Sequence, residues 1–564
     1  MVNPDDPQYI IQENGYYYVA SMTPEPGTYN AAVVTVSAKG VVNGLSEKYN
    51  DGFLFGPDTY NPNYTGTGMP YTQTSGILEA VNYASINNVK IFIMDGIYNT
   101  NTTITITNSH IHIQGTHAII QPTTTFSGNS YGDCIIIDVD SVGFLEDISI
   151  TGISFDFKNL VSGTFANGIH LKYTLATQNL NYVNMRFTNI SGYNLPQQSS
   201  TEYGNNAVIY LTGTNTSATG LTHVVIKNFF AQNCWQGIAF IGTSGVSISN
   251  ATILNSTSYG ITNFANSLDS SVTFGPTTFF IISDSYITNP EYNLPVNTST
   301  FFASPTGIYI SGSQWVISST VVGGYGVGII CSNVESNGIG MISNSYVEYN
   351  SGQGINIQGS TDTYAFPVVV SGCAVQYNGQ STTPTGYAEG ISISNASVLI
   401  TDCFIYSNYG YGIQALTPGT GLTPTLKIDN VKFSTDGQPA NNSGAMSLGS
   451  YEAGNLIVTN VNPSDLPSPS ISANPPVSGT VYQNTNPYDV EIDLPAYATT
   501  AGTAGYVTVA KGSSSTPTSI GNQFVNGSTS STSTDIIRLR VPAGWYYEFT
   551  ASGVTFGTAS VFAD

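Results

Sequence analysis

Residues 339–355 read IGMISNSYVEYNSGQGI, and residues 397–413 read SVLITDCFIYSNYGYGI. Both stretches follow one frame: a strand, a small residue, a second short strand, an Asn and then a Gly-Ile pair. Strand side chains alternate between two faces. The small residue and the aliphatic residue after it are therefore predicted to point inward and to stack on their equivalents in neighbouring repeats.

The Gly-Ile pair sets the period of the repeat. The pairs begin at Gly237, Gly260, Gly307, Gly328, Gly354, Gly390 and Gly412. The clean intervals are 23, 21, 26 and 22 residues, while the 47-residue gap fits two coils and the 36-residue gap fits one coil with a loop insertion. A period in the low twenties with alternating hydrophobicity is typical of a parallel β-solenoid with one coil per repeat.

Two columns of equivalent residues support this frame. The inward position is small in six coils, at Ala251, Ser285, Thr320, Ser345, Cys373 and Cys403. An Asn recurs four or five residues later, at Asn233, Asn255, Asn289, Asn350, Asn378 and Asn408. An Asn at a sharp turn suits a left-handed backbone, and stacked amides can hydrogen-bond along the axis. We therefore predict an Asn ladder, although ordinary loop composition is the alternative.

Charge and composition limit the partners. The chain has 12 Lys and Arg against 34 Asp and Glu, a net charge of −22 at pH 7, and no basic stripe. Such a surface repels phosphate backbones, so nucleic acid is not a predicted partner. Only 8% of residues are charged, which suits an acidic extracellular medium or simply a secreted β-rich protein. No apolar run is long enough for a membrane-spanning helix, and residues 1–6 carry no features of a secretory signal.

The cysteines and histidines predict no cofactor and no metal site. Five scattered cysteines are too few for a disulfide framework, and no Cys-x-x-Cys or His-x-x-x-His spacing occurs. Cys373 and Cys403 occupy equivalent positions in successive coils. They are either stacked buried thiols or an axial disulfide.

The chain divides into four parts. Residues 1–70 form an N-terminal extension or docking segment with no solenoid frame, and residues 71–459 form the solenoid. A Pro/Ser-rich linker at 460–478 leads to a β-sandwich at 479–564. In the sandwich, Trp545, Tyr547 and Phe549 alternate with polar residues and are predicted to share the core face, with a sugar-stacking platform as the alternative.

The start of the solenoid resembles a known family. Residues 75–81 read SGILEAV, residues 91–98 read IFIMDGIY and residues 111–115 read IHIQG. This order looks like the opening of pectate-lyase-like right-handed parallel β-helices, in which a helix caps the solenoid and a Gly-x-Tyr turn opens the first coil. The resemblance covers about residues 70 to 435. It implies a right-handed single-stranded parallel β-helix with an N-terminal capping helix. With the C-terminal β-sandwich read from the strands after the linker, the predicted fold class is all-β.

The same family includes polysaccharide lyases, glycoside hydrolases, phage tailspikes and non-catalytic surface proteins, so activity needs its own argument. If the chain is an enzyme, the candidate catalytic residues are acidic: Asp138, Asp140, Glu146, Asp147 and Asp156. Asp138 and Asp140 are predicted to alternate on one strand and to face outward about 6.5–7 Å apart, at the low edge of the range for an inverting glycosidase pair. The alternatives are solvated positions on a sheet face or a cation site.

Several expected signatures are missing. The galacturonan-hydrolase motifs (Asn-Thr-Asp, paired Asp, Gly-His-Gly, Arg-Ile-Lys) are absent, and the solenoid has one Arg, Arg186, where a lyase needs a base and cations for the uronate. His110 and His112 share one strand face with isoleucines opposite, which suits either an acid/base pair or exposed surface positions.

The sequence therefore favours a virion or cell-surface structural and attachment protein without catalysis, associated with a spike or vertex. Its composition resembles the turret and petal proteins of icosahedral archaeal viruses from hot acidic springs. The alternatives are a polysaccharide-degrading enzyme (glycoside hydrolase or lyase, tailspike depolymerase type) and an archaeal surface-layer or adhesin protein. Predicted partners are other virion or surface proteins and a host glycan or pilus, with a homo-oligomer as a further option. The predicted location is the virion surface or the extracellular medium.

Overall fold

The computed structural model describes residues 10–13, 16–19, 33–36, 54–55, 73–127, 132–173, 182–197, 206–213, 223–263, 278–289, 305–311, 314–334, 339–359, 367–379, 388–419, 423–433, 441, 443–449, 455–461, 474–484, 486, 489–499, 504–525 and 535–563. It contains two compact units, Met1–Asn356 and Ile357–Asp564. Each unit is described by itself. The predicted boundaries at 70/71, 459/460 and 478/479 stay predictions.

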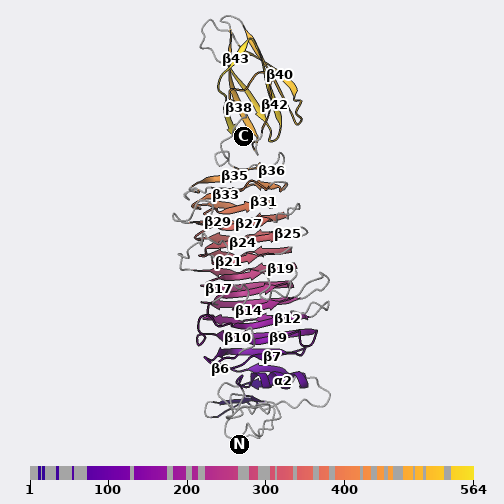
Figure 1. Ribbon diagram of the computed structural model, residues 1–564, viewed down its shortest axis with the longest axis vertical. Coiled ribbons are helices and arrows are strands. Elements are labelled where there is room, and N and C mark those ends of the chain that lie inside the picture. The colour runs from indigo at the N-terminus through magenta and orange to yellow at the C-terminus, as the bar shows by residue number, and fades with distance from the viewer. Residues whose placement is uncertain are drawn as a thin grey trace. The chain divides into compact units, whose positions relative to one another are not determined.

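Unit 1 is a stack of parallel strands (Figure 1). One sheet follows the order of the Gly-Ile pairs: β7 (Ile104–Ile106), β9 (Asp133–Asp138), β11 (Asn167–Lys172), β14 (Ala207–Thr212), β16 (Gln236–Ile241), β18 (Tyr259–Asn263), β21 (Thr306–Ile310) and β24 (Val327–Val334). We call it the Gly-Ile sheet.

The remaining parallel strands of unit 1 wind around the same core. They are β5 (Lys90–Ile93), β6 (Gly96–Thr100), β8 (His112–Pro122), β10 (Leu145–Asp156), β12 (Tyr182–Thr188), β13 (Ser191–Tyr193), β15 (Val224–Gln232), β17 (Ser244–Leu254), β19 (Thr278–Ser283), β20 (Tyr286–Thr288), β22 (Gln314–Ser318), β23 (Val321–Gly323), β25 (Ile339–Ser343) and β26 (Tyr346–Glu348). The fold is the predicted right-handed parallel β-helix.

The structure describes four strands before residue 70, and two of them join this arrangement. A small antiparallel pair is formed by β1 (Ile10–Glu13) and β2 (Tyr16–Val19). By contrast, β3 (Val33–Val36) pairs in parallel with β4 (Leu54–Phe55) and with β5. β3 and β4 therefore add parallel strands to the stack although their sequence has no solenoid frame, because parallel pairing needs no repeated sequence.

One helix, α2 (Ile77–Asn87), precedes the first coil as predicted. Its buried face contains Ile77, Val81 and Ala84. Gly76 is the N-cap with a left-handed backbone and no side-chain cap bond, and the Thr74 hydroxyl instead accepts a hydrogen bond from the Leu78 amide at 3.1 Å. These three residues lie four and three positions apart, which is the spacing of one helix face, and that face is the buried one.

The inward columns are confirmed, and one coil count is corrected. All six small residues, from Ala251 to Cys403, are buried. However, β18 pairs directly with β21, so the 47-residue gap between Gly260 and Gly307 is one coil and not two. Coils are counted by which strands pair with each other. The number of residues between two paired strands can vary, so a long gap need not contain an extra coil.

The Asn column is confirmed as a set of contacts, with a correction to its backbone. Asn233 and Asn255 have the predicted positive φ, at 55° each, and Asn255 Nδ2 donates to Asn233 Oδ1 at 3.2 Å. In the coils of Asn350, Asn378 and Asn408 the preceding residue takes the positive φ, as at Tyr377 and Ser407. The Asn that follows is then buried, and its side-chain amide forms hydrogen bonds with residues of the neighbouring coils.

Unit 2 continues with parallel strands and then a sandwich. The parallel strands are β28 (Pro367–Ser371), β29 (Ala374–Gln376), β30 (Ile391–Ser394), β31 (Ser397–Thr401), β32 (Phe404–Tyr406), β33 (Tyr411–Ala415), β34 (Leu426–Asp429), β35 (Gly444–Leu448) and β36 (Leu456–Thr459), while β27 (Ile355–Gly359) spans the division between the units. Cys373 and Cys403 are free thiols at neighbouring positions of this stack.

The sandwich has two antiparallel sheets. One has the order β37 (Val481–Gln483), β42 (Tyr546–Ser552), β39 (Gly505–Gly512) and β40 (Thr518–Val525); the other contains β41 (Asp535–Val541), β38 (Val490–Ala498), β43 (Val554–Phe556) and β44 (Ser560–Ala563). Tyr547 and Phe549 lie in its core as predicted. Trp545 precedes β42 and is partly exposed, so the aromatic core face holds two of the three predicted residues.

Candidate functional site

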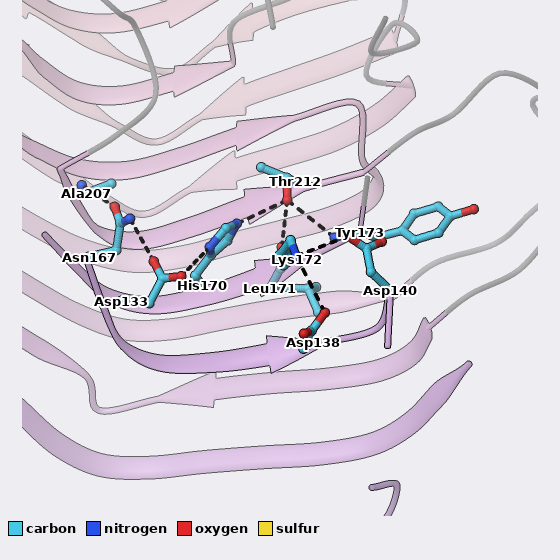
Figure 2. Close-up of polar contacts among 10 residues, drawn as sticks. All are labelled: Asp133, Asp138, Asp140, Asn167, His170, Leu171, Lys172, Tyr173, Ala207 and Thr212. Carbon is cyan, nitrogen blue, oxygen red and sulfur yellow. Dashed lines mark hydrogen bonds and ion pairs between the residues drawn. The ribbon is translucent and has the colours of Figure 1, made fainter. Parts of the chain in front are cut away.

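A chain of hydrogen-bonded polar side chains crosses three neighbouring strands of the Gly-Ile sheet (Figure 2). Asp133 Oδ2 lies 2.8 Å from His170 Nδ1, and His170 Nε2 lies 3.1 Å from the Thr212 hydroxyl oxygen. Their exposed fractions are 0%, 1% and 3%. A carboxylate, an imidazole and a hydroxyl in this order are the groups of an acid–base relay. We call them the Asp133–His170–Thr212 chain.

Parallel register brings these residues together. Asp133 begins β9, His170 lies within β11 and Thr212 ends β14. In the ladder, Asn167 is opposite Asp133 and Tyr210 is opposite His170. Neighbouring strands lie about 4.8 Å apart, so polar side chains that point to the same face of three strands can meet.

Further contacts hold the carboxylate and the ring in place. Asn167 Nδ2 donates to Asp133 Oδ1 at 2.9 Å, and its Oδ1 accepts from the Ala207 amide at 3.0 Å. The His170 ring stacks on Tyr210 with 4.6 Å between ring centroids. The orientation of the imidazole is therefore fixed by both its hydrogen bonds and its plane.

Two proton arrangements satisfy the Thr212 oxygen. When His170 is neutral and Nδ1–H donates to Asp133, Nε2 can accept the Thr212 proton, which is the arrangement that activates a hydroxyl. When Thr212 donates to the Leu171 carbonyl at 3.2 Å, Nε2–H donates to Thr212, and an imidazolium faces Asp133. The hydroxyl oxygen also lies 3.4 Å from the Tyr173 amide nitrogen. Either way the groups bond one another, and burial leaves a substrate no access to the oxygen.

Lys172 joins two of the predicted acidic residues at the end of β11. Its Nζ lies 3.8 Å from Asp138 Oδ1 and 3.4 Å from Asp140 Oδ2, as Figure 2 shows. β9 ends at Asp138 and Asp140 lies in the turn that follows, so the two do not alternate on one strand as predicted. The three side chains are partly exposed, by 11–22%.

Glu146 and Asp147 lie beside two histidines. His110 Nε2 is 3.6 Å from Glu146 Oε1, and Asp147 Oδ2 is 3.5 Å from both His110 Nδ1 and His112 Nε2. Ile111 between the histidines is buried. β8 begins at His112, and His110 lies before it with a φ of 62°, so the two histidines do not share one strand as predicted, although both are exposed. All four polar side chains are substantially exposed, as in a solvated surface cluster.

Asp156 lies at the other end of β10 from Glu146. It accepts hydrogen bonds from Gln121 Nε2 at 3.1 Å and Asn194 Nδ2 at 3.0 Å, and it pairs with Lys158 Nζ at 3.2 Å. Burial by itself would raise the pKa of Asp156. Hydrogen bonds from Asn194 and Lys158, with the Lys158 charge, outweigh burial and lower this pKa.

The five predicted acidic residues therefore form three groups with different partners. Asp138 and Asp140 share a lysine, Glu146 and Asp147 share His110, and Asp156 has amides and a second lysine. Each carboxylate lies near a positive or amide group. Their role as catalytic residues stays a hypothesis for the enzyme alternative.

The Asp133–His170–Thr212 chain was not found from the sequence. A signal was available, because His170 directly follows the Gly168-Ile169 pair, which is a copy of the repeat phrase upstream of Gly237. Extending the frame upstream would have placed β11 next to β9. The contact itself depends on three unlike residues that occur once, so no repeat pattern points to it.

Within the described residues, no group of three or more His, Cys, Asp or Glu side chains could hold a metal ion. In the same part of the chain, none of the helices is both long and apolar enough to cross a membrane.

No protein-family model matches the chain, and no curated protein matches it. Solved structures do share its architecture. The tailspike protein of E. coli bacteriophage HK620 in complex with a pentasaccharide is similar at 12% identity and a TM-score of 0.45, over 91% of each chain. The Azotobacter vinelandii mannuronan C-5 epimerase AlgE6 A-module is similar at 12% identity and a TM-score of 0.41, over 69% of this chain and 93% of that chain.

A third similar structure is the periplasmic alginate epimerase AlgG, at 11% identity and a TM-score of 0.37, over 66% of this chain and 76% of that chain. Likeness at these identities and TM-scores carries no argument about activity or ligands. The shared feature is the β-helix fold.

Proposed function

We propose that the chain is a non-catalytic structural and attachment protein at the surface of a virion or a cell. The observation that carries this proposal is the closure of the Asp133–His170–Thr212 chain, whose groups bond one another and whose three residues are buried. Groups that could perform acid–base chemistry are used to bind three strands together. This arrangement supports a rigid scaffold better than a turnover site.

The partners and the location follow from the same reasoning and remain part of the proposal. The chain is built from few charges, many hydroxyl and amide groups and 37 Tyr residues, which suits contact with other surface proteins and with a host glycan or pilus. A position at a virion vertex, as in turret and petal proteins, is supported only by composition.

Location is the direct test. Immunogold electron microscopy on particles and cells from the native source should place antibody against the chain on an outer surface. Label found only inside cells, or absent from intact surfaces while present in lysates, would contradict the proposal.

A polysaccharide-degrading enzyme is the second candidate, and one observation favours it. Asp138, Asp140 and Lys172 converge and are partly exposed, so a carboxylate and an amine are available as acid and base. Release of reducing ends or unsaturated uronates from a polysaccharide panel, abolished by Asp140→Asn, would establish the enzyme. The same panel left intact by the wild-type chain would support the attachment role.

A further inference from the structure

A column of outward-facing residues on unit 1 carries an aromatic ring in every second coil. Strand register aligns this column: Ser191, Phe230, Thr252, Tyr286, Val321 and Tyr346. Tyr286 is 48% exposed and Tyr346 is 54% exposed, while Phe230 is half-buried. We call these six positions the aromatic column.

The rings of this column are evenly spaced. One coil separates Phe230 from Tyr286, at Thr252, and one separates Tyr286 from Tyr346, at Val321. Neighbouring strands lie about 4.8 Å apart, so the aromatic positions repeat about every 9.6 Å. That distance is similar to the length of a disaccharide in an extended glycan. A linear chain along the helix axis could stack alternate sugar rings on the three aromatic residues.

Polar groups follow the same line on the neighbouring strands. The residue three positions before each member of the aromatic column is polar. From the coil of Phe230 onward these residues are Lys227, Ser249, Ser283, Ser318 and Ser343. At the corner between the two columns, Asn228 Nδ2 donates to Asn189 Oδ1 at 2.9 Å, and Asn250 Nδ2 donates to Asn228 Oδ1 at 2.8 Å. Hydrogen-bonding groups therefore run beside the rings, as sugar hydroxyls require.

Charge selects among glycans. The aromatic column contains no charged residue, although the chain carries −22 overall. At the corner, Asp284 is acidic in a position where Asn250 and Asn344 are neutral. One cation, Lys227, lies beside Phe230 in the neighbouring column, opposite Ser249. An anionic glycan would meet that single cation against the negative charge of the whole chain, whereas a neutral glycan is not repelled.

We propose that the aromatic column binds a linear neutral glycan, laid along the axis of unit 1. The proposal rests on the attachment role, and it adds the ligand class and the surface that binds it. Aromatic rings supply flat apolar platforms at low entropy cost, the side chains already point outward, and the spacing of two coils sets the register of the ligand.

The test compares the full-length chain with a double variant, Tyr286→Ala with Tyr346→Ala. The probe is an array of linear neutral hexasaccharides of glucose, galactose, mannose and N-acetylglucosamine in α and β linkage, with hexagalacturonate as the acidic comparison. The matched control is Tyr506→Ala, which removes a 40%-exposed Tyr from the sandwich. A second variant, Tyr286→Trp with Tyr346→Trp, keeps both platforms.

We expect at least one neutral hexasaccharide to bind. Its affinity should fall at least about tenfold in the Ala variant, because two stacked rings are lost, and should persist in the Trp variant and the Tyr506→Ala control. Binding to no neutral hexasaccharide, a preference for hexagalacturonate, or unchanged affinity in the Ala variant overturns the inference. Melting curves of all variants establish that each is folded.

Failure of this inference is distinguishable from failure of the attachment role. If immunogold label lies on an outer surface while the Ala variant keeps its glycan affinity, the attachment role stands and the column is not the binding surface. If the column binds a neutral glycan but no label reaches a surface, the inference stands and the proposed role falls.

Discussion

Replacing Asn408 by Ala tests how far the buried Asn contacts hold the coils of unit 2 together. The Asn408 side chain is fully buried. Its Oδ1 accepts from both the amide and the Nδ2 of Asn378, at 3.1 and 2.9 Å. Its Nδ2 donates to the Val375 carbonyl at 3.0 Å and to Asn441 Oδ1 at 2.9 Å. Asn408→Ala thus removes four hydrogen bonds between three successive coils.

The expected cost follows from these contacts. A buried hydrogen bond contributes about 1 kcal/mol net, with a range of roughly 0.5–1.5, so the variant should lose about 4 kcal/mol. The matched control is Asn430→Gly, because Asn430 is exposed, has φ of 52° and makes one side-chain bond, to Asp402. Glycine tolerates that backbone, so this variant should lose less than about 1 kcal/mol.

Hydrogen–deuterium exchange measures the local effect, and guanidinium denaturation measures the global one. In Asn408→Ala the amide of Asn378 should exchange up to about 10³-fold faster, which corresponds to 4 kcal/mol. The Asn430→Gly control should leave that amide protected. Equal exchange in both variants, or no change in either, would refute the role of the buried amides.

Three further predictions concern charge, thiols and register. The pKa of Asp156 is lower in the folded protein than in the unfolded chain, where it is about 3.9. Its carboxylate therefore stabilises the fold above the unfolded pKa, and this contribution is lost as pH falls through the lower folded pKa. Asp156→Asn should lower the Tm at neutral pH and leave it unchanged near pH 2. Burial raises the pKa of Cys234 to about 12, so iodoacetamide at about pH 8 should label it only after unfolding, and mass spectrometry showing native labelling would contradict this. One residue inserted between Ser392 and Ile393 moves the buried Ile393 to the opposite face of β30 and should abolish soluble expression. One residue inserted in the exposed hairpin after Ser513 should not. Equal yields of the two variants would argue against the register.

The repeat explains why so much of the solenoid was predictable. Ala251, Ser345 and Cys403 differ in chemistry, but each follows the same pattern and each is buried. Stacking makes one coil the template for the next, so a frame learned from two stretches applied to many. The same logic failed at the gap between Gly260 and Gly307, because length along the chain says little about how many strands it contains.

The candidate site was less predictable because it is not repeated. Asp133, His170 and Thr212 lie on three coils and share no sequence pattern. Asp138 and Asp140 were singled out as a pair, and they do converge, but through Lys172 rather than by alternation on a strand. To predict which side chains meet between coils, both the strand register and the number of residues in each coil must be known. The sequence alone did not determine the number of residues in each coil.

Coil length itself has an evolutionary consequence. Asn189, Asn228 and Asn250 occupy one corner of successive coils, yet the first two are 39 residues apart and the next two are 22 apart. Loop-closure entropy grows only with the logarithm of length, so the longer coil costs about 0.5 kcal/mol more than the shorter one. Insertions and deletions between strands are thus nearly neutral for the fold. A lineage could replace whole stretches between strands in a few mutational events and explore new surfaces without a compensating change in the stacked coils.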